Sequence, residues 1–136
     1  KVKATGPLAG VNLIGGTTGA PMIDIDVKNK LATSLVAPHV ATNGQWTSSL
    51  MVCNPHPSAT TVTILYTNKM GVISGLSEQS IPAMGAVQLD IMTLFGVIDG
   101  GAFRITSTNG ISSFLLYDGT SAAGSYWKAG LSVVEQ

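Results

Sequence analysis

The chain has 136 residues, the length of one domain, and 45% of them are apolar, which is enough to build a core. Only 10% are charged, against roughly 25% in an average globular protein, and the 7 basic and 7 acidic side chains cancel. So few cations exclude the clusters that nucleic acid or an anionic membrane surface attracts. No apolar run approaches the ~20 residues of a membrane span, so we expect none.

Alternation of apolar and polar residues with a period of two dominates the chain and predicts strands. Within residues 61–67, for example, Val62, Ile64 and Tyr66 share one face, and threonines occupy the other. In chain order, strands are predicted at residues 7–14, 22–27, 33–38, 46–53, 61–67, 72–80, 86–91, 101–107, 111–117 and 126–134.

Turn residues separate the predicted strands. The Asn-Pro-His-Pro-Ser sequence at 54–58 predicts a connection, because proline does not fit a central strand. The Asn- and Gly-containing sequences at 68–71 and 108–110 predict short hairpin turns. Residues 90–96 predict one short helical turn that ends at Gly96. We therefore expect a single all-β domain over residues 1–136, built as an antiparallel two-sheet β-sandwich with a Greek-key connection.

The most distinctive string runs from Ala37 to Pro55. It combines Ala-Pro-His-Val-Ala, a short polar loop, Trp-Thr-Ser, an apolar strand and a closing Asn-Pro. Over roughly residues 34–119 the chain resembles repeat modules of large secreted or surface proteins of bacteria. This resemblance implies an immunoglobulin-like β-sandwich that is extracellular or at the cell surface, with the periplasm as an alternative, and it carries no catalytic residues with it.

The two ends of the chain are similar to each other. Residues 2–17 align without gaps on residues 105–120, with identical residues at Thr5/Thr108, Leu13/Leu116, Gly16/Gly119 and Thr17/Thr120. Such a repeat is typical of a unit cut from a tandem array. We therefore interpret residues 1–30 as the tail of a preceding unit. An excised unit exposes a strand edge, so we expect binding to neighbouring repeat units or to itself, as a dimer.

Residues with catalytic or metal-binding chemistry are few. No Gly-x-Ser-x-Gly sequence or paired carboxylate motif occurs, so we expect no enzyme activity and no cofactor. His39 and His56 lack the spacing and the further ligands of a metal site. Asp24 and Asp26 share a strand face and are weak calcium candidates, but we favour a solvated edge for them.

Three single residues carry structural expectations. His39 is predicted to bond loop backbone and so fix the start of the strand at Trp46. His56, between two prolines, is predicted to lie at the surface. Cys53 has no second cysteine with which to pair, and we expect it to be a small buried hydrophobe.

The aromatic residues suggest a ligand site. If exposed together, five aromatic residues could stack on a sugar ring: Trp46, Tyr66, Tyr117, Tyr126 and Trp127. Asn43 and Gln45 of the polar loop would then be hydrogen-bonding groups. The alternation also fits core packing for Trp46 and Tyr66. The first hypothesis is accordingly a non-catalytic structural or interaction module, a spacer or adhesion unit of a larger protein. The alternative is a carbohydrate- or small-ligand-binding module.

Overall fold

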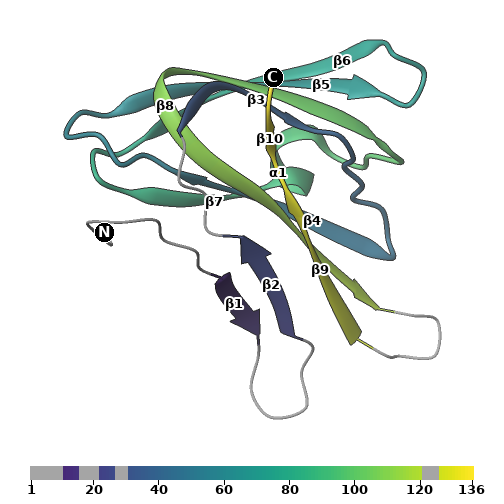
Figure 1. Ribbon diagram of the computed structural model, residues 1–136. Coiled ribbons are helices and arrows are strands. Elements are labelled where there is room, and N and C mark those ends of the chain that lie inside the picture. Colours follow the sequence, from purple (N-terminus) through teal and green to yellow (C-terminus); the bar gives the residue numbers. More distant parts are fainter. Residues whose placement is uncertain (1–10, 16–21, 27–30, 121–125) are drawn as a thin grey trace.

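The computed structural model describes residues 11–15, 22–26, 31–120 and 126–136, and it describes the side chains of residues 31–120 and 128–136. The elements in chain order are β1 (Val11–Gly15), β2 (Met22–Asp26), β3 (Ala32–Ala37), β4 (Trp46–Cys53), β5 (Thr60–Asn68), β6 (Ile73–Ile81), β7 (Ala86–Asp90), α1 (Ile91–Phe95), β8 (Gly101–Thr120), β9 (Tyr126–Ser132) and β10 (Val134–Glu135). All the strand pairs are antiparallel, so the prediction of an antiparallel β fold with one short helical turn is confirmed (Figure 1).

The long strand β8 organises the sheet. Its first half pairs with β5 on one side and β3 on the other, and its second half pairs with β4 and β9. β6 extends the sheet beyond β5, β10 beyond β3, and β7 beyond β4. The result is one open eight-stranded sheet that bends along β8, as the curved ribbon in Figure 1 shows. The two-sheet sandwich and the immunoglobulin-like topology are not confirmed, because β8 belongs to both parts.

The predicted hairpin turn at residues 108–110 is wrong, because β8 continues through it. In β3, Ala32 pairs with Ile111 and Ser34 pairs with Thr106. The two β3 residues are closer together in the sequence than their two partners in β8. The extra residues of β8 form an irregularity of the bulge type, which bends a strand without ending it. Asn109 is held there, since its Nδ2 donates to Thr60 Oγ1 at 3.1 Å.

The core follows the predicted alternation. In β5 the buried side chains are those of Thr60, Val62, Ile64 and Tyr66, and the intervening residues are more exposed. The largest fully buried side chains are those of Phe103, Leu50, Ile64, Ile81, Ile91, Ile98, Ile105, Ile111 and Leu115. The rings of Tyr66, Phe95 and Phe103 contact one another, with centroids 5.2 to 6.1 Å apart. Burial of these apolar side chains is the main favourable term in folding.

Helix α1 is a single turn, as predicted. Asp90 caps it, because its Oδ1 accepts a hydrogen bond from the backbone N–H of Thr93 at 2.6 Å. Gly96 ends it with a φ of 73°, and its N–H donates to Met92 O. The helix lies next to β4 and β7, and its Phe95 ring covers the sheet at Gly75.

Cys53 is exposed, so the expectation of a buried residue is wrong. The alternation along β4 buries Leu50 and Val52, and this sends Cys53 to the opposite face.

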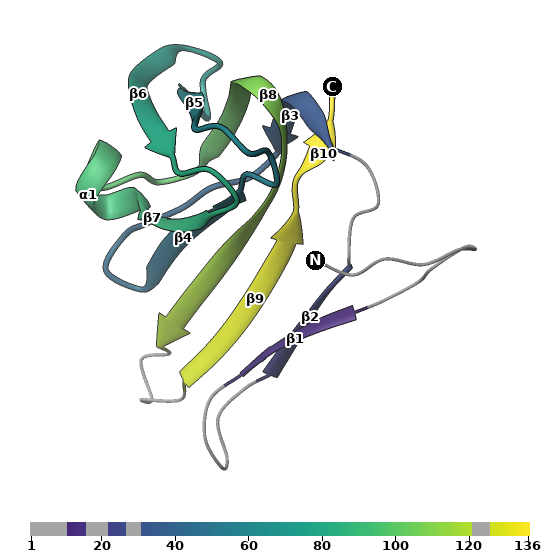
Figure 2. The ribbon, with the colours of Figure 1, turned by 90° about the vertical axis from the view of Figure 1, so that its left-hand side faces the viewer.

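Strands β1 and β2 pair with each other, and among the described strands neither is hydrogen-bonded to the eight-stranded sheet. Figure 2 shows them beside β9, and the backbone of β2 approaches that strand. The end-to-end repeat lies partly outside the described residues, which do not include 1–10. The interpretation of residues 1–30 as the tail of a preceding unit therefore stays a prediction.

Thr42 offers a test of hydrogen bonding in the core. It is fully buried, and its Oγ1 has no hydrogen-bond partner, although its backbone is bonded to Ile98 in both directions. Since an unpartnered buried hydroxyl is costly and valine has nearly the same shape, Thr42→Val should raise the free energy of unfolding by about 1 kcal/mol. Urea denaturation measures this change.

The matched control is Thr60, which is equally buried but accepts the hydrogen bond from Asn109. Thr60→Val should therefore lower the free energy of unfolding by about 1 kcal/mol. If both variants lowered the free energy of unfolding, the Thr42 hydroxyl would not be a destabilising group.

Candidate functional site: an aromatic hollow

Among the residues that the structure describes, four from separate segments line an apolar hollow of about 180 Å³, and we call it the aromatic hollow. His39 follows β3, Trp46 begins β4, Tyr117 lies in the second half of β8, and Ala129 lies in β9. Each element brings one wall, so the hollow exists only in the folded sheet.

The strand register explains why space remains beside the two large rings. Trp46 is opposite Gly119, and Tyr117 is opposite Ala129. Directly opposite residues share a face of the sheet, so a glycine and an alanine are among the neighbours of Trp46 and Tyr117 on that face. These small residues leave space beside the two rings. Trp46 is accordingly half-buried and packs against the core from its edge.

Tyr117 and His39 form a reciprocal pair of hydrogen bonds. The Tyr117 hydroxyl donates to the backbone oxygen of His39 at 2.7 Å, and the same hydroxyl oxygen lies 3.1 Å from His39 Nδ1. The hydroxyl has one proton, and this proton lies in the hydrogen bond to the carbonyl oxygen of His39. Nδ1 must therefore carry a proton and donate, which leaves Nε2 of the neutral ring as an acceptor.

Ring contacts and burial fix Tyr117 further. Its ring meets Trp46 edge-on, with centroids 6.1 Å apart and planes at 79°, and its centroid lies 5.8 Å from that of His39. Burial raises the pKa of the Tyr117 hydroxyl well above its ordinary value, so the group stays a neutral donor at physiological pH. Among the described residues, the lining of the hollow is aromatic and almost entirely apolar.

The polar loop supports Trp46. Asn43 and Trp46 exchange two backbone hydrogen bonds of 2.9 and 3.0 Å, and Asn43 Oδ1 accepts from the N–H of Gln45. Gln45 O accepts from the N–H of Thr120, which ties the loop to the end of β8. Asn43 and Gln45 are not among the residues that line the hollow, so their side chains support the site rather than form it.

The two histidines differ from their predictions. The His39 ring bonds the Tyr117 hydroxyl instead of loop backbone, although it does hold the segment before Trp46 in place. His56 is half-buried, and its Nε2 bonds Gly110 O at 2.9 Å, so it joins the 54–58 connection to β8. The sequence offered Tyr117 only as one of several aromatic candidates and gave no signal for Ala129, because only strand register brings these two residues beside Trp46.

The other candidate site residues lie partly outside the part of the chain that the structure describes. The backbones of Tyr126 and Trp127 pair with Thr120 and Gly119, and their side chains lie outside the described residues. The side chains of Asp24 and Asp26 in β2 lie outside them too. In the part of the chain that the structure describes, no group of three or more His, Cys, Asp or Glu side chains could hold a metal ion.

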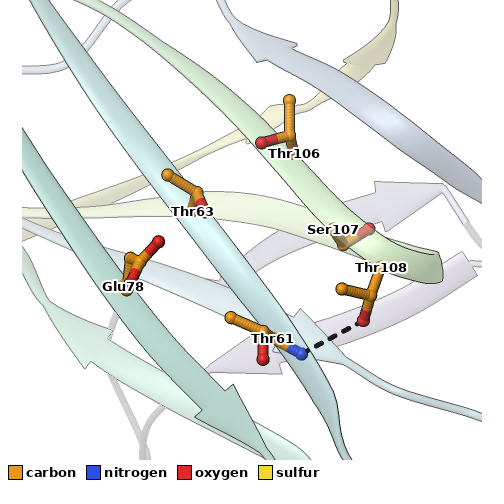
Figure 3. A pocket seen from close by; sticks show the side chains of 6 residues that line it. All are labelled: Thr61, Thr63, Glu78, Thr106, Ser107 and Thr108. Carbon is orange, nitrogen blue, oxygen red and sulfur yellow. Dashed lines mark hydrogen bonds between the residues drawn. The ribbon is translucent and has the colours of Figure 1, made fainter.

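A second depression lies on the other part of the sheet and is polar. Its volume is about 310 Å³, and Figure 3 shows the hydroxyl groups and the single carboxylate that line it: Thr61, Thr63, Glu78, Thr106, Ser107 and Thr108. The Thr61 N–H donates to Thr108 Oγ1 at 3.3 Å. These residues come from β5, β6 and β8, and none of the described residues that line the depression is aromatic.

Comparison with known proteins gives the fold alone. No protein-family model and no curated protein matches the sequence. Among solved structures, the crystal structure of Thermotoga maritima 1070 is similar, with a TM-score of 0.69 over 77% of this chain and 95% of that chain. The sequence identity is 14%, so the likeness concerns chain topology. No helix in the described part of the chain has the length and apolar character that spanning a membrane requires.

Proposed function

We propose that the protein is a non-catalytic interaction module, a spacer or adhesion unit of a larger secreted or surface protein of bacteria. The observation that supports it is the edge of β6, which among the described strands pairs on one side only. This proposal includes an immunoglobulin-like character, a place outside the cell, and the role of residues 1–30 as the tail of a preceding unit. They rest on the Ala37 to Pro55 string and on the end-to-end repeat.

Strand β6 is long and open on one side. It has 9 residues and, among the described strands, pairs only with β5. It contains no Lys, Arg or Pro, the residues with which proteins commonly block pairing at an edge. Ile73 and Leu76 are each 63% exposed, so apolar surface accompanies the free backbone. An edge of this kind is a template for a further strand.

Along a strand, the backbone N–H and C=O groups of successive residues point to alternate sides. This alternation shows which residues of β6 would pair with an added strand. The N–H of Thr61 points toward β8, because it donates to Thr108. Alternate residues of β5, such as Val62, therefore point toward β6, where Val62 is opposite Gln79. It follows that Leu76 and Glu78, which lie between the β6 residues bonded to β5, direct their backbone groups to the free side.

A second copy of the chain fits this edge. If two β6 strands pair antiparallel with Ser77 opposite Ser77, all nine residues overlap. Glu78 then lies opposite Leu76 of the other copy, so the like charges are not directly opposed. A two-fold axis makes such an interface self-complementary.

Analytical ultracentrifugation over a concentration series tests this association. The wild-type chain should form dimers, and Leu76→Glu should remain monomeric, because the new carboxylate lies directly opposite Glu78 of the other copy and like charges repel. Thr61→Glu is the matched control, since Thr61 is exposed on β5 and away from the edge. Monomeric wild-type protein at all concentrations, or equal dissociation of both variants, would contradict the proposal.

A second candidate function, a small-ligand-binding module, is supported by the aromatic hollow. Among the described residues, the rings of His39, Trp46 and Tyr117 and the methyl group of Ala129 line an open and almost entirely apolar hollow. A thermal-shift screen of small cyclic compounds and sugars tests this candidate, since a ligand that binds the folded state raises its melting temperature.

A further inference from the structure

We infer that strands β1 and β2 are the counterpart of strands β8 and β9, and that β9 is the surface on which the C-terminal strand pair of a preceding unit packs. The inference rests on the proposed role of residues 1–30 as the tail of a preceding unit. It names the piece of that unit which the tail represents and the surface that this piece contacts.

The similarity between the two ends of the chain falls on a strand at both ends. Residues 2–17 align on residues 105–120, so β1 aligns on residues 114–118. These residues belong to the second half of β8, which continues to Thr120. The described part of the first segment is therefore a strand at the position where the second segment is also a strand.

The partner strands extend the equivalence beyond the aligned residues. β1 and the second half of β8 are each followed in the chain by an antiparallel partner, β2 and β9 respectively. Val11 is opposite Asp26, and its counterpart Phe114 is opposite Ser132. A valine comes directly after Asp26 and directly after Ser132. Sequence and strand pairing thus give the two segments the same role.

The length of chain that leads to the next strand agrees as well. In this chain, residues 27–31 join β2 to β3. If a second copy of residues 31–136 followed directly, residues 133–136 and Leu31 would join β9 to the next β3 over the same number of residues. The C-terminal strand pair of one unit therefore has the same length of chain with which to reach the place that β1 and β2 occupy here.

Strand β9 is the surface that this arrangement assigns to the preceding unit. Among the described strands, β9 is hydrogen-bonded only to β8, and the backbone of β2 runs beside it without pairing. Figure 2 shows β1 and β2 next to β9, outside the eight-stranded sheet. Because β2 is the counterpart of β9, equivalent strands of successive units pack against each other. Contacts between neighbouring units stabilise arrays of repeats.

Strand β1 lacks a neighbour that its counterpart has. The second half of β8 pairs with β4 on one side and β9 on the other, whereas β1 and β2 form a separate two-stranded sheet among the described strands. Two strands by themselves are only marginally stable. The preceding unit would supply the β4-like strand, and in this chain the contact with β9 supports the pair.

Distances between two spin labels, measured by pulsed electron paramagnetic resonance, test the inference in a Cys53→Ser background. In the full chain, labels at Asp26→Cys and Ser132→Cys should give a narrow distance distribution, because β2 lies beside β9. In a fusion of the full chain with a second copy of residues 31–136, labels at Ser132→Cys of both copies should give the same distribution. Dilution with unlabelled protein removes distances between separate molecules.

The matched control moves the label of the first copy from Ser132 to Thr61, which is exposed in the other part of the sheet and should not reproduce the distribution. Three results would overturn the inference: a broad distribution in the full chain, a different one in the fusion, or a second copy that stays unfolded beside a folded first copy. The edge of β6 is unchanged in every variant, so sedimentation of the wild-type chain decides the proposed function independently.

Discussion

Replacing Asn54 with alanine is expected to lower the free energy of unfolding by about 2–4 kcal/mol, because it breaks a buried cluster of hydrogen bonds. Asn54 is fully buried, and its Nδ2 lies within 2.8 to 3.2 Å of the backbone oxygens of Ser58, Ile81 and Pro82. The amide has two hydrogens, so one is shared between two of these oxygens. Its Oδ1 accepts from the N–H of His56 at 3.1 Å.

These bonds join two connections that are far apart in the sequence. The Asn54 N–H also donates to Gly85 O, so the residue ties the 54–58 connection to the loop after β6. Alanine leaves the three oxygens without this donor, and the buried Ile81 O has no access to water in exchange. Chemical denaturation measured by circular dichroism gives the size of the loss.

Asn68 is the matched control for Asn54. Its side chain makes a similar set of bonds, since Nδ2 donates to Ser74 and Oδ1 accepts from the N–H groups of Met70 and Val72. These bonds are exposed, so water can replace them, and Asn68→Ala should cost less than about 1 kcal/mol. Equal losses in the two variants would show that burial is not what gives the Asn54 cluster its effect.

Gly101→Ala is expected to lower the free energy of unfolding by about 3–5 kcal/mol. Gly101 begins β8 with a φ of 141°, a conformation that residues with a Cβ rarely adopt. A Cβ at this position would lie 2.4 Å from Thr67 O and 2.6 Å from Tyr66 Cε2. The oxygen is a backbone atom of the neighbouring strand, so relief of the clash requires β5 and β8 to separate. Thermal and urea denaturation measure the effect.

Gly71 separates the two causes of this effect. It also has a positive φ, of 78°, but a Cβ there would meet no atom within 4 Å. Gly71→Ala therefore carries the backbone strain without the clash and should cost about 1–2 kcal/mol. If Gly101→Ala cost no more than Gly71→Ala, the close approach of β5 to β8 would not be the reason for glycine at residue 101.

The alternation of apolar and polar residues predicted the local structure correctly in most of the strands. Alternation of Val62, Ile64 and Tyr66 with threonines is a property of the residues themselves, and it places β5 and its buried face correctly. Asp90 and Gly96 likewise bound the helical turn through local capping. Short-range sequence sufficed in both cases, because the interactions that decide them join residues a few positions apart.

Residues 108–110 show where local signals fail. Asn and Gly favour a turn in isolation. Here Ile111 pairs with Ala32 of β3, and the Asn109 side chain donates to Thr60 of β5. Because β8 has partners on both sides, the chain continues as a bulged strand instead of turning. Cys53 is a simpler case, because its apolar character suggested burial and the register of β4 decided the opposite.

The sequence by itself determined that this chain is all-β and nearly devoid of net charge, that its strands fall at these places, and that Trp46 and His39 are worth examining together. The tertiary structure alone decided that β8 is one strand shared by both parts of the sheet, that β6 pairs only with β5 among the described strands, and that Tyr117 and Ala129 line a hollow at Trp46. The physical reason is that alternation specifies which face of a strand is buried but not which strand lies beside it. That choice depends on packing and hydrogen bonds between residues such as His39 and Tyr117, which are 78 positions apart.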